Sequence, residues 1–239
     1  MKLYFNTAAL GLSLLAAQVA YSHNINQSPF DNEAVNRAVA AKEPAGLRTV
    51  ADKALQSLVA SLSAQYAREA IPANFVFDVS DVKSLKSATL GMAFEVYSAA
   101  PQALMNAKTR FDQQLVGTGI WNFMVMVNGR AVGLVGMEKI QGNWEFSSAG
   151  AAKLANDVQQ SSQRNAGKQG FRFVRIYQAT SDFLEVKNDQ GELGYAPLIA
   201  ARATLQLASP FGTSSGADAS SAQDILPKIQ AILSKNIAK

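Results

Sequence analysis

The 239-residue sequence contains no cysteine and a single histidine, His23. The lack of thiols excludes cysteine nucleophiles, disulfide frameworks and Cys/His zinc sites. A lone histidine near the N-terminus argues against multi-histidine metal centres and against a histidine triad in the folded body. A terminal His23 would offer copper an amine and an imidazole, but the second imidazole of such sites is missing. We therefore expect no metal and no cofactor.

The sequence also has only a small excess of basic over acidic residues. The chain has 22 basic and 18 acidic residues, which gives a formal net charge of +4 at pH 7. The basic residues are scattered and form no run of four. Nucleic-acid binding and attachment to an acidic membrane both require clustered basic side chains. We expect neither.

Residues 1–22 have the features of a secretory signal peptide. Lys2 gives a short positive start, residues 8–20 form an apolar run, and Ala20-Tyr21-Ser22 places small residues before a cut at His23. The run is shorter than the ~20 apolar residues of a membrane-spanning helix. Without cysteine, the chain also lacks the acylation site of a bacterial lipoprotein. The sequence thus predicts an exported, periplasmic or secreted protein with no stable membrane anchor.

Removal of the first 22 of 239 residues leaves 217, enough for a core that needs no disulfides. Residues 23–46 are polar and rich in alanine, and we expect them to be loosely ordered. Residues 47–69 show the clearest helical pattern, because apolar side chains recur at spacings of three and four. This apolar stripe consists of Leu47, Val50, Ala51, Ala54, Leu55, Leu58, Val59, Leu62 and Tyr66.

After Ile71-Pro72 the apolar period changes to two, which is typical of strands. Strands are expected at 75–79, 93–97, 120–127, 130–140, 144–146, 171–178, 183–186 and 193–195, helices at 101–108 and 148–164, and either element at 198–207. One long helix followed by these strands predicts an α+β domain over residues 47–208. We expect a mostly antiparallel, curved sheet packed on the long N-terminal helix, an arrangement that resembles cystatin-like and NTF2-like domains at the level of fold.

The dipeptide Asn128-Gly129 predicts a two-residue type I′ turn between two strands. With this turn, Val125 faces Val132, and alternation places three methionines on the surface opposite the bulky core face. Methionine suits surfaces that accept varied partners or apolar ligands; burial of both faces under helices is the alternative. The expected binding face consists of Asn122, Met124, Met126, Val135 and Met137.

Residues 209–222 have the composition of a flexible Ser/Gly/Ala linker. Beyond them, residues 223–239 form an amphipathic helix in which Pro227 is tolerated only near the start. The apolar stripe of this helix either docks on its own domain or inserts into a partner. The candidate partner-docking residues are Ile225, Ile229, Ile232 and Leu233.

No catalytic constellation stands out among the remaining residues. Acidic pairs lie at strand ends and turns, where such residues usually hydrogen-bond to the backbone. The basic and aromatic residues interleaved over 172–178 are interpreted as two solvated arginines, Arg172 and Arg175, beside a core strand. A catalytic Ser-Lys dyad is kept as an alternative, because the spacing of serines and lysines in the sequence does not exclude one.

Three functions follow from these patterns. The first is an exported, non-enzymatic accessory protein that acts as a modulator, chaperone or inhibitor of another extracytoplasmic protein. The second is a carrier of a lipid or another apolar ligand, held between the helix stripe and the sheet. The third is a hydrolase that uses carboxylates or a Ser-Lys pair.

Overall fold

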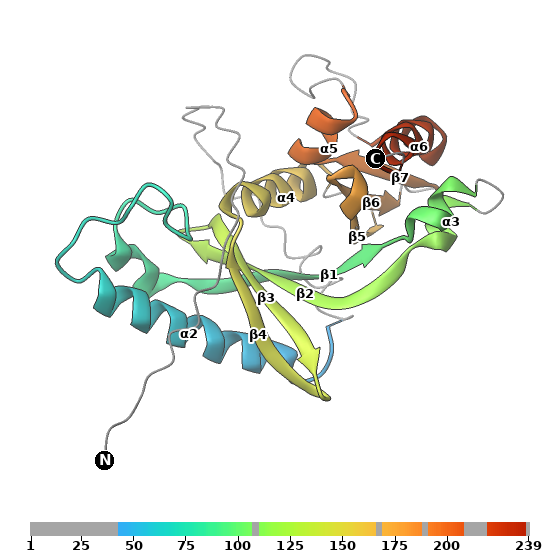
Figure 1. Cartoon of the computed structure of the whole chain (residues 1–239). Helices are drawn as coiled ribbons and strands as arrows, with labels where there is room; N and C mark the ends of the chain where they lie inside the picture. Colours follow the sequence, from blue (N-terminus) through green and yellow to red (C-terminus); the bar gives the residue numbers. More distant parts are fainter. Residues whose placement is uncertain (1–42, 107–109, 166–168, 188–190, 208–218, 238–239) are drawn as a thin grey trace.

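The computed structural model describes residues 43–106, 110–165, 169–187, 191–207 and 219–237, and shows an α+β fold with an open, mostly antiparallel sheet (Figure 1). The expected signal peptide, most of the N-terminal lead-in and most of the expected linker lie outside these residues. The end of the lead-in is held in place, since Glu43 forms an ion pair with Arg48 at 2.7 Å. None of the described helices has the length and apolarity needed to cross a bilayer.

The sheet has seven strands in the order β4-β3-β2-β1-β5-β6-β7. Strands β1 to β4 form an antiparallel meander, helix α4 crosses over, and β5 to β7 form a second meander. The two meanders meet where β5 runs parallel to β1. The strands are β1 (Thr89–Ser98), β2 (Val116–Val127), β3 (Arg130–Ile140), β4 (Asn143–Gly150), β5 (Gln169–Ile176), β6 (Ser181–Lys187) and β7 (Leu193–Pro197).

Helices lie on both faces of this sheet (Figure 1). The longest is α2. It begins after Gly46, whose own backbone is left-handed, and its buried residues are Leu47, Ala51, Leu55 and Leu62. These four residues belong to the apolar stripe predicted from the sequence. The helix ends at Gln65, whereas the pattern predicted a helix to residue 69. The helices are α2 (Leu47–Gln65), α3 (Pro101–Met105), α4 (Ala152–Arg164), α5 (Ile199–Thr204) and α6 (Ala222–Ile237), with short 3-10 turns η1 (Val82–Ser87), η2 (Phe111–Gln114) and η3 (Tyr177–Ala179).

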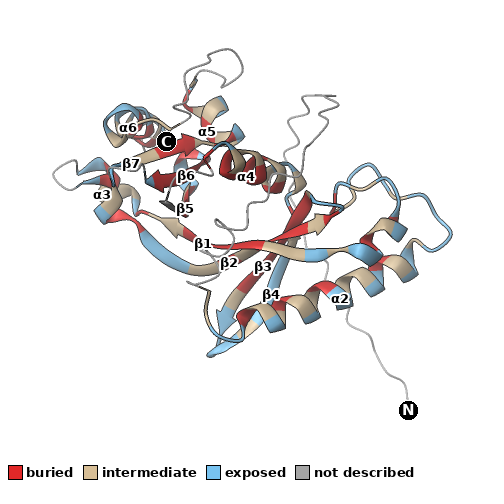
Figure 2. Ribbon diagram, turned by 180° about the vertical axis from the view of Figure 1, so that it is seen from behind, coloured by how far each residue is buried: buried red, intermediate tan, exposed pale blue. Residues whose placement is uncertain are grey.

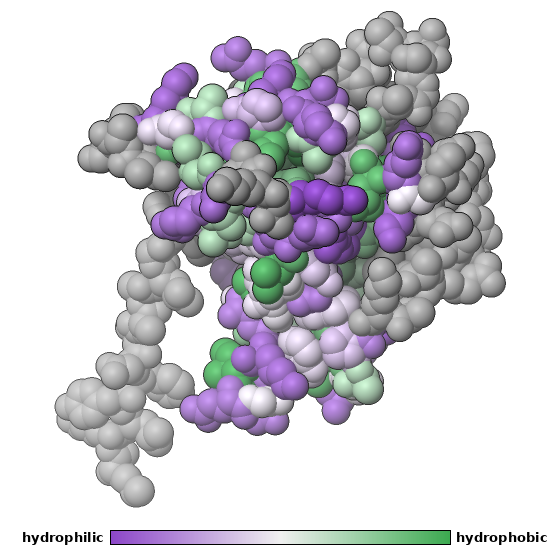
Figure 3. Space-filling view, turned by 90° about the vertical axis from the view of Figure 1, so that its right-hand side faces the viewer, coloured by the Kyte–Doolittle hydropathy of each residue, from purple (hydrophilic) through white to green (hydrophobic). Residues whose placement is uncertain are grey.

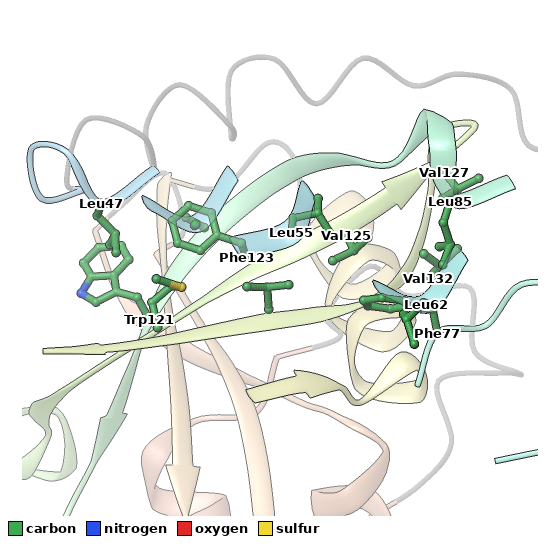
Figure 4. Close-up of a cluster of buried hydrophobic side chains, with 14 of the residues drawn as sticks. Leu47, Leu55, Leu62, Phe77, Leu85, Trp121, Phe123, Val125, Val127 and Val132 are labelled. Carbon is green, nitrogen blue, oxygen red and sulfur yellow. The ribbon is translucent and has the colours of Figure 1, made fainter. Parts of the chain in front are cut away.

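Three apolar clusters fill the space between these layers. The α2 cluster lies between helix α2 and β1 to β3, where Leu47 packs beside Trp121 at one end and Leu62 lies near Phe77 at the other (Figure 4). The α4 cluster covers the opposite face and includes Met92, Phe94 and Phe173. The α6 cluster joins α6 to the second meander. Figure 2 shows the buried residues along the strands where helices cover them.

The hairpin between β2 and β3 keeps its predicted turn but not its predicted register. Asn128 and Gly129 both have positive φ, and Val127 pairs with Arg130 as expected. A bulge then shifts the pairing, so Val125 lies opposite Gly133 and not Val132. The carbonyl of Val132 accepts a hydrogen bond from Asp78 N at 2.8 Å, which accounts for the extra residue.

Residues 75–79, expected to be a strand, are not one. This segment runs across the end of the hairpin, and its Phe77 ring occupies the space where a side chain at Gly133 would lie. The helix expected at 148–164 begins later, because β4 continues to Gly150 and the chain turns at Gly150 and Ala151, which both have positive φ. The ambiguous segment 198–207 contains the short helix α5.

Candidate functional site

The two outer strands of the sheet differ in how their free sides are covered. Strand β7 is covered in part, since Tyr195 N donates to Ser220 O at 2.8 Å and Ser220 N donates to Tyr195 O at 3.0 Å. Among the described residues, no segment pairs with the outer side of β4. The β4 strand is also largely exposed (Figure 2). An exposed edge of this kind is a template on which another chain can pair.

The turn before β4 determines which of its backbone groups point outward. Gln141 and Gly142 have φ angles of 51° and 88° and connect Ile140 to its partner Asn143. In a two-residue hairpin the flanking pair is hydrogen-bonded, and the pattern then alternates. The N–H and C=O groups of Trp144 and Phe146 therefore point away from β3, toward the free side. We call residues 143–146, which precede the bulge in this pairing, the β4 edge.

One face of the β4 edge is aromatic. Trp144 packs partly against the α2 cluster, with the Lys139 amine 5.7 Å from the centre of its ring. Phe146 lies opposite the buried Met137 and is 45% exposed. On the side of the molecule that Figure 3 shows, hydrophobic residues lie in small groups among hydrophilic ones. Phe146 and Trp144 give the edge an apolar surface beside its free backbone groups.

The other face of the β4 edge is acidic. Glu138 on β3 lies directly opposite Glu145 on β4. No described cation forms an ion pair with either carboxylate. Like charges opposite each other across a ladder are destabilising. Ile140, which is 44% exposed, ends the same face. The outer side of the hairpin thus carries two carboxylates whose mutual repulsion no ion pair of the described residues offsets.

A second polar feature, the polar row, crosses the junction of the two meanders. It consists of Glu95 and Tyr97 on β1, Arg172 on β5, Glu185 on β6 and Tyr195 on β7. Arg172 donates to both carboxylate oxygens of Glu185 at 2.6 Å, and its guanidinium lies 5.1 Å from the centre of the Tyr97 ring. Its two tyrosines adjoin the α6 cluster, which contains Tyr195 and against which Tyr97 packs.

A wide irregularity in β2 makes room for the row. Glu95 pairs with Trp121 and Tyr97 pairs with Gly117, so β2 has extra residues between these positions. Gly119, with φ of 77°, donates its N–H to Glu95 Oε1 at 3.3 Å. A side chain at Gly117 would overlap the Glu95 carboxylate. The bulge therefore serves to place Glu95 between β1 and β2.

The surroundings of the row raise the pKa values of its two tyrosines and of Arg172. Burial, then the charge of Glu95 and a hydrogen bond with it, raises the pKa of Tyr97 above the ordinary 10.0. Burial and the charge of Glu185 raise the pKa of Tyr195 in the same direction. Burial disfavours the charged form of Arg172, but the hydrogen bonds and charge of Glu185 outweigh it and raise its pKa. At neutral pH both phenols are protonated and Arg172 is a paired cation.

The expected binding face of the hairpin is split by the bulge. Val135 and Met137 lie in the α2 cluster, whereas Met124 and Met126 lie across the sheet in the α4 cluster. Met124, Val135 and Met137 are at most 4% exposed. The prediction that the five residues share one surface is therefore wrong. Asn122 is half-buried opposite Gly136, on the same side of the sheet as Glu138.

The C-terminal helix docks on its own domain. Ile225, Ile229 and Leu233 are fully buried in the α6 cluster, and Ile232 packs against it. The helix is also held by Gln230, whose amide donates to Leu104 O at 2.7 Å. Of the two arrangements that the sequence allowed for this stripe, the structure has the intramolecular one.

The view of Arg172 and Arg175 as solvated side chains is wrong. Arg175 donates to both oxygens of Asp182 at 2.8 and 2.9 Å, and both arginines are mostly buried. Sequence reasoning also missed the Glu138–Glu145 pair. That pair could have been found by counting outward from the Gln141-Gly142 turn.

No group of three or more His, Asp or Glu side chains suited to hold a metal ion occurs in the part of the chain that the structure describes. No family model, no curated protein and no solved structure matches this chain.

Proposed function

We propose that this chain is an exported accessory protein that binds another extracytoplasmic protein through the β4 edge. One observation carries the proposal: among the described residues, β4 is an unpaired outer strand with an exposed aromatic residue beside its free backbone groups. Soluble proteins normally protect such edges, and extended segments of partner proteins bind to those left open. Export rests on the signal-peptide features of residues 1–22.

The same reasoning favours a modulator, chaperone or inhibitor, since such proteins act by holding a segment of their partner. The carrier of an apolar ligand and the hydrolase stay as competing proposals. The fully buried side chains of the α2 cluster fill the region in which a carrier would hold its ligand. At the level of fold, we propose the arrangement of cystatin-like and NTF2-like domains for helix α2 and the strands β1 to β3 that it crosses.

The test begins with the full precursor, tagged at its C-terminus and expressed in its source cell. The mature N-terminus, read by mass spectrometry, is expected at His23. Partner proteins are then captured from the periplasm or medium with the wild type, Phe146→Pro and Phe146→Ala. Proline removes the outward N–H and is tolerated there because that N–H faces away from β3, whereas alanine removes only the ring.

We expect Phe146→Pro to abolish capture of the partner and Phe146→Ala to weaken it. Tyr177→Ala serves as the matched control, because Tyr177 is an aromatic residue of similar exposure, 48%, on another part of the molecule. Capture that is unchanged by Phe146→Pro would contradict the assignment of the surface. A chain that captures no partner but converts a substrate would contradict the accessory role.

A further inference from the structure

We infer that the occupant of the β4 edge is an extended partner segment that carries a lysine or arginine between two apolar residues. This inference rests on the proposed function and names the chemistry of the partner. It follows from three properties of the edge: the outward backbone groups, the aromatic face and the acidic face.

The first step concerns the position opposite Glu145. If a strand is added antiparallel to β4, Trp144 and Phe146 exchange hydrogen bonds with it, since their N–H and C=O groups point outward. Glu145 then faces its new neighbour across a non-hydrogen-bonded pair, where side chains approach most closely. The side chain opposite Glu145 points to the acidic face.

The second step is charge complementarity. Glu145 is exposed, with the carboxylate of Glu138 on one side and no strand of the described residues on the other. A cation on the added strand would make Glu145 the centre of a favourable pair and offset the repulsion from Glu138. An acidic residue there would place three carboxylates in a row. The site therefore selects lysine or arginine at this position.

The third step concerns the neighbouring positions. Residues before and after the cation point to the other face, opposite Trp144 and Phe146. Trp144 is half-buried and Phe146 is 45% exposed, so apolar partner side chains would cover them. The regular pairing of β4 with β3 from its turn ends at the bulge after Phe146, which limits this selection to about three partner residues.

A second copy of the chain fits this edge less well. Glu145 is the sole charged residue of β4, so pairing of two β4 strands offers no cation to either Glu145. Self-pairing would also leave both Glu138–Glu145 pairs unrelieved. The observed charges thus favour a different protein as the partner.

The experiment uses the full mature chain and three synthetic seven-residue peptides. Each peptide alternates threonine and valine, with lysine, glutamine or glutamate at the centre and valine on both sides. Binding is followed by fluorescence anisotropy of a dye on the peptide, and by the tryptophan emission of the protein. We expect the lysine peptide to bind at least about threefold more tightly than the glutamine peptide, and the glutamate peptide to bind weakest.

Variants separate the contributions. Glu145→Gln should reduce the lysine preference to less than about twofold, and Phe146→Pro should abolish binding of all three peptides. Glu69→Gln is the charge-matched control, since Glu69 is exposed and lies outside the sheet. The lysine preference should shrink as salt is added, because the charges are exposed. Circular dichroism confirms that each variant is folded.

Three results would overturn the inference. Equal affinity for the three peptides would show that the acidic face does not select, while strand addition at β4 would stand. Absence of binding to a folded chain would remove the peptide motif, and the capture experiment would then decide the proposed function separately. A concentration-dependent dimer that Phe146→Pro abolishes would identify the occupant as a second copy.

Discussion

Gly117 illustrates how a single residue supports the polar row. Its missing side chain leaves the space that the Glu95 carboxylate occupies. Gly117→Ala should force Glu95 to move and weaken its bond with Gly119 N, at a cost of about 1–3 kcal/mol in the free energy of unfolding. Urea denaturation measures this cost. In a Glu95→Ala background, which lacks the carboxylate, Gly117→Ala should change the free energy of unfolding very little. If Gly117→Ala costs as much in that background as in the wild type, its clash lies elsewhere.

The tyrosines of the row give the protein a distinct alkaline response. The pKa values of Tyr97 and Tyr195 are raised in the folded state, so folding favours their protonated forms. Their contribution to stability is present below the unfolded-state value of about 10 and is lost as pH rises through the folded values.

We therefore expect the thermal midpoint of unfolding to fall from about pH 10 upward, and to fall less steeply in Tyr195→Phe. Calorimetry between about pH 8 and pH 11 measures both curves. Tyr177→Phe, at an exposed position, is the control. Identical alkaline slopes in Tyr195→Phe and the wild type would disprove the assignment.

At the scale of elements, helix α6 contributes to the core and not only to the surface. Ile229 is fully buried, whereas Ala231, two residues further along the helix, is exposed. Ile229→Asp places an unpaired charge in the α6 cluster and should destabilise the protein by about 3 kcal/mol or more. Ala231→Asp adds the same charge on the solvent side and should change stability by less than about 0.5 kcal/mol. Equal effects in urea denaturation would show that α6 is detached in solution.

The elements also show what the sequence could and could not predict. Local signals sufficed for most strands and for the turn at Asn128, because alternation and glycine are readable within a few residues. The bulge at Val132 was not readable, since it depends on a hydrogen bond from the distant Asp78. That bulge moved Val135 and Met137 to the opposite face and divided the expected binding face. The ion pairs of Arg172 and Arg175 depend on the pairing of β5 with β6, which one strand alone does not reveal.

At the scale of the whole molecule, the two meanders are joined by few backbone contacts. The parallel ladder of β1 and β5 pairs only Val96 with Phe173 and Tyr97 with Val174. Side chains supply the rest of the connection: the rings of Phe94 and Phe173 lie 4.9 Å apart within the α4 cluster, which draws residues from both meanders. Arg172 contacts Tyr97 from the other side.

This continuity of the core predicts one cooperative unfolding transition for both meanders. Both tryptophans, Trp121 and Trp144, lie in the first meander, so their fluorescence reports on that half, while far-UV circular dichroism reports on all elements. The two urea curves should coincide in the wild type.

Phe173→Ala removes the ring that links the halves and should lower the free energy of unfolding by about 3–5 kcal/mol. Because this ring packs against Phe94 across the junction, the tryptophan curve of Phe173→Ala should separate from the dichroism curve, with the second meander unfolding first. Ile120→Ala, a half-buried position at the margin of the same cluster, should shift both curves together, and a split there or in the wild type would show that the meanders fold independently.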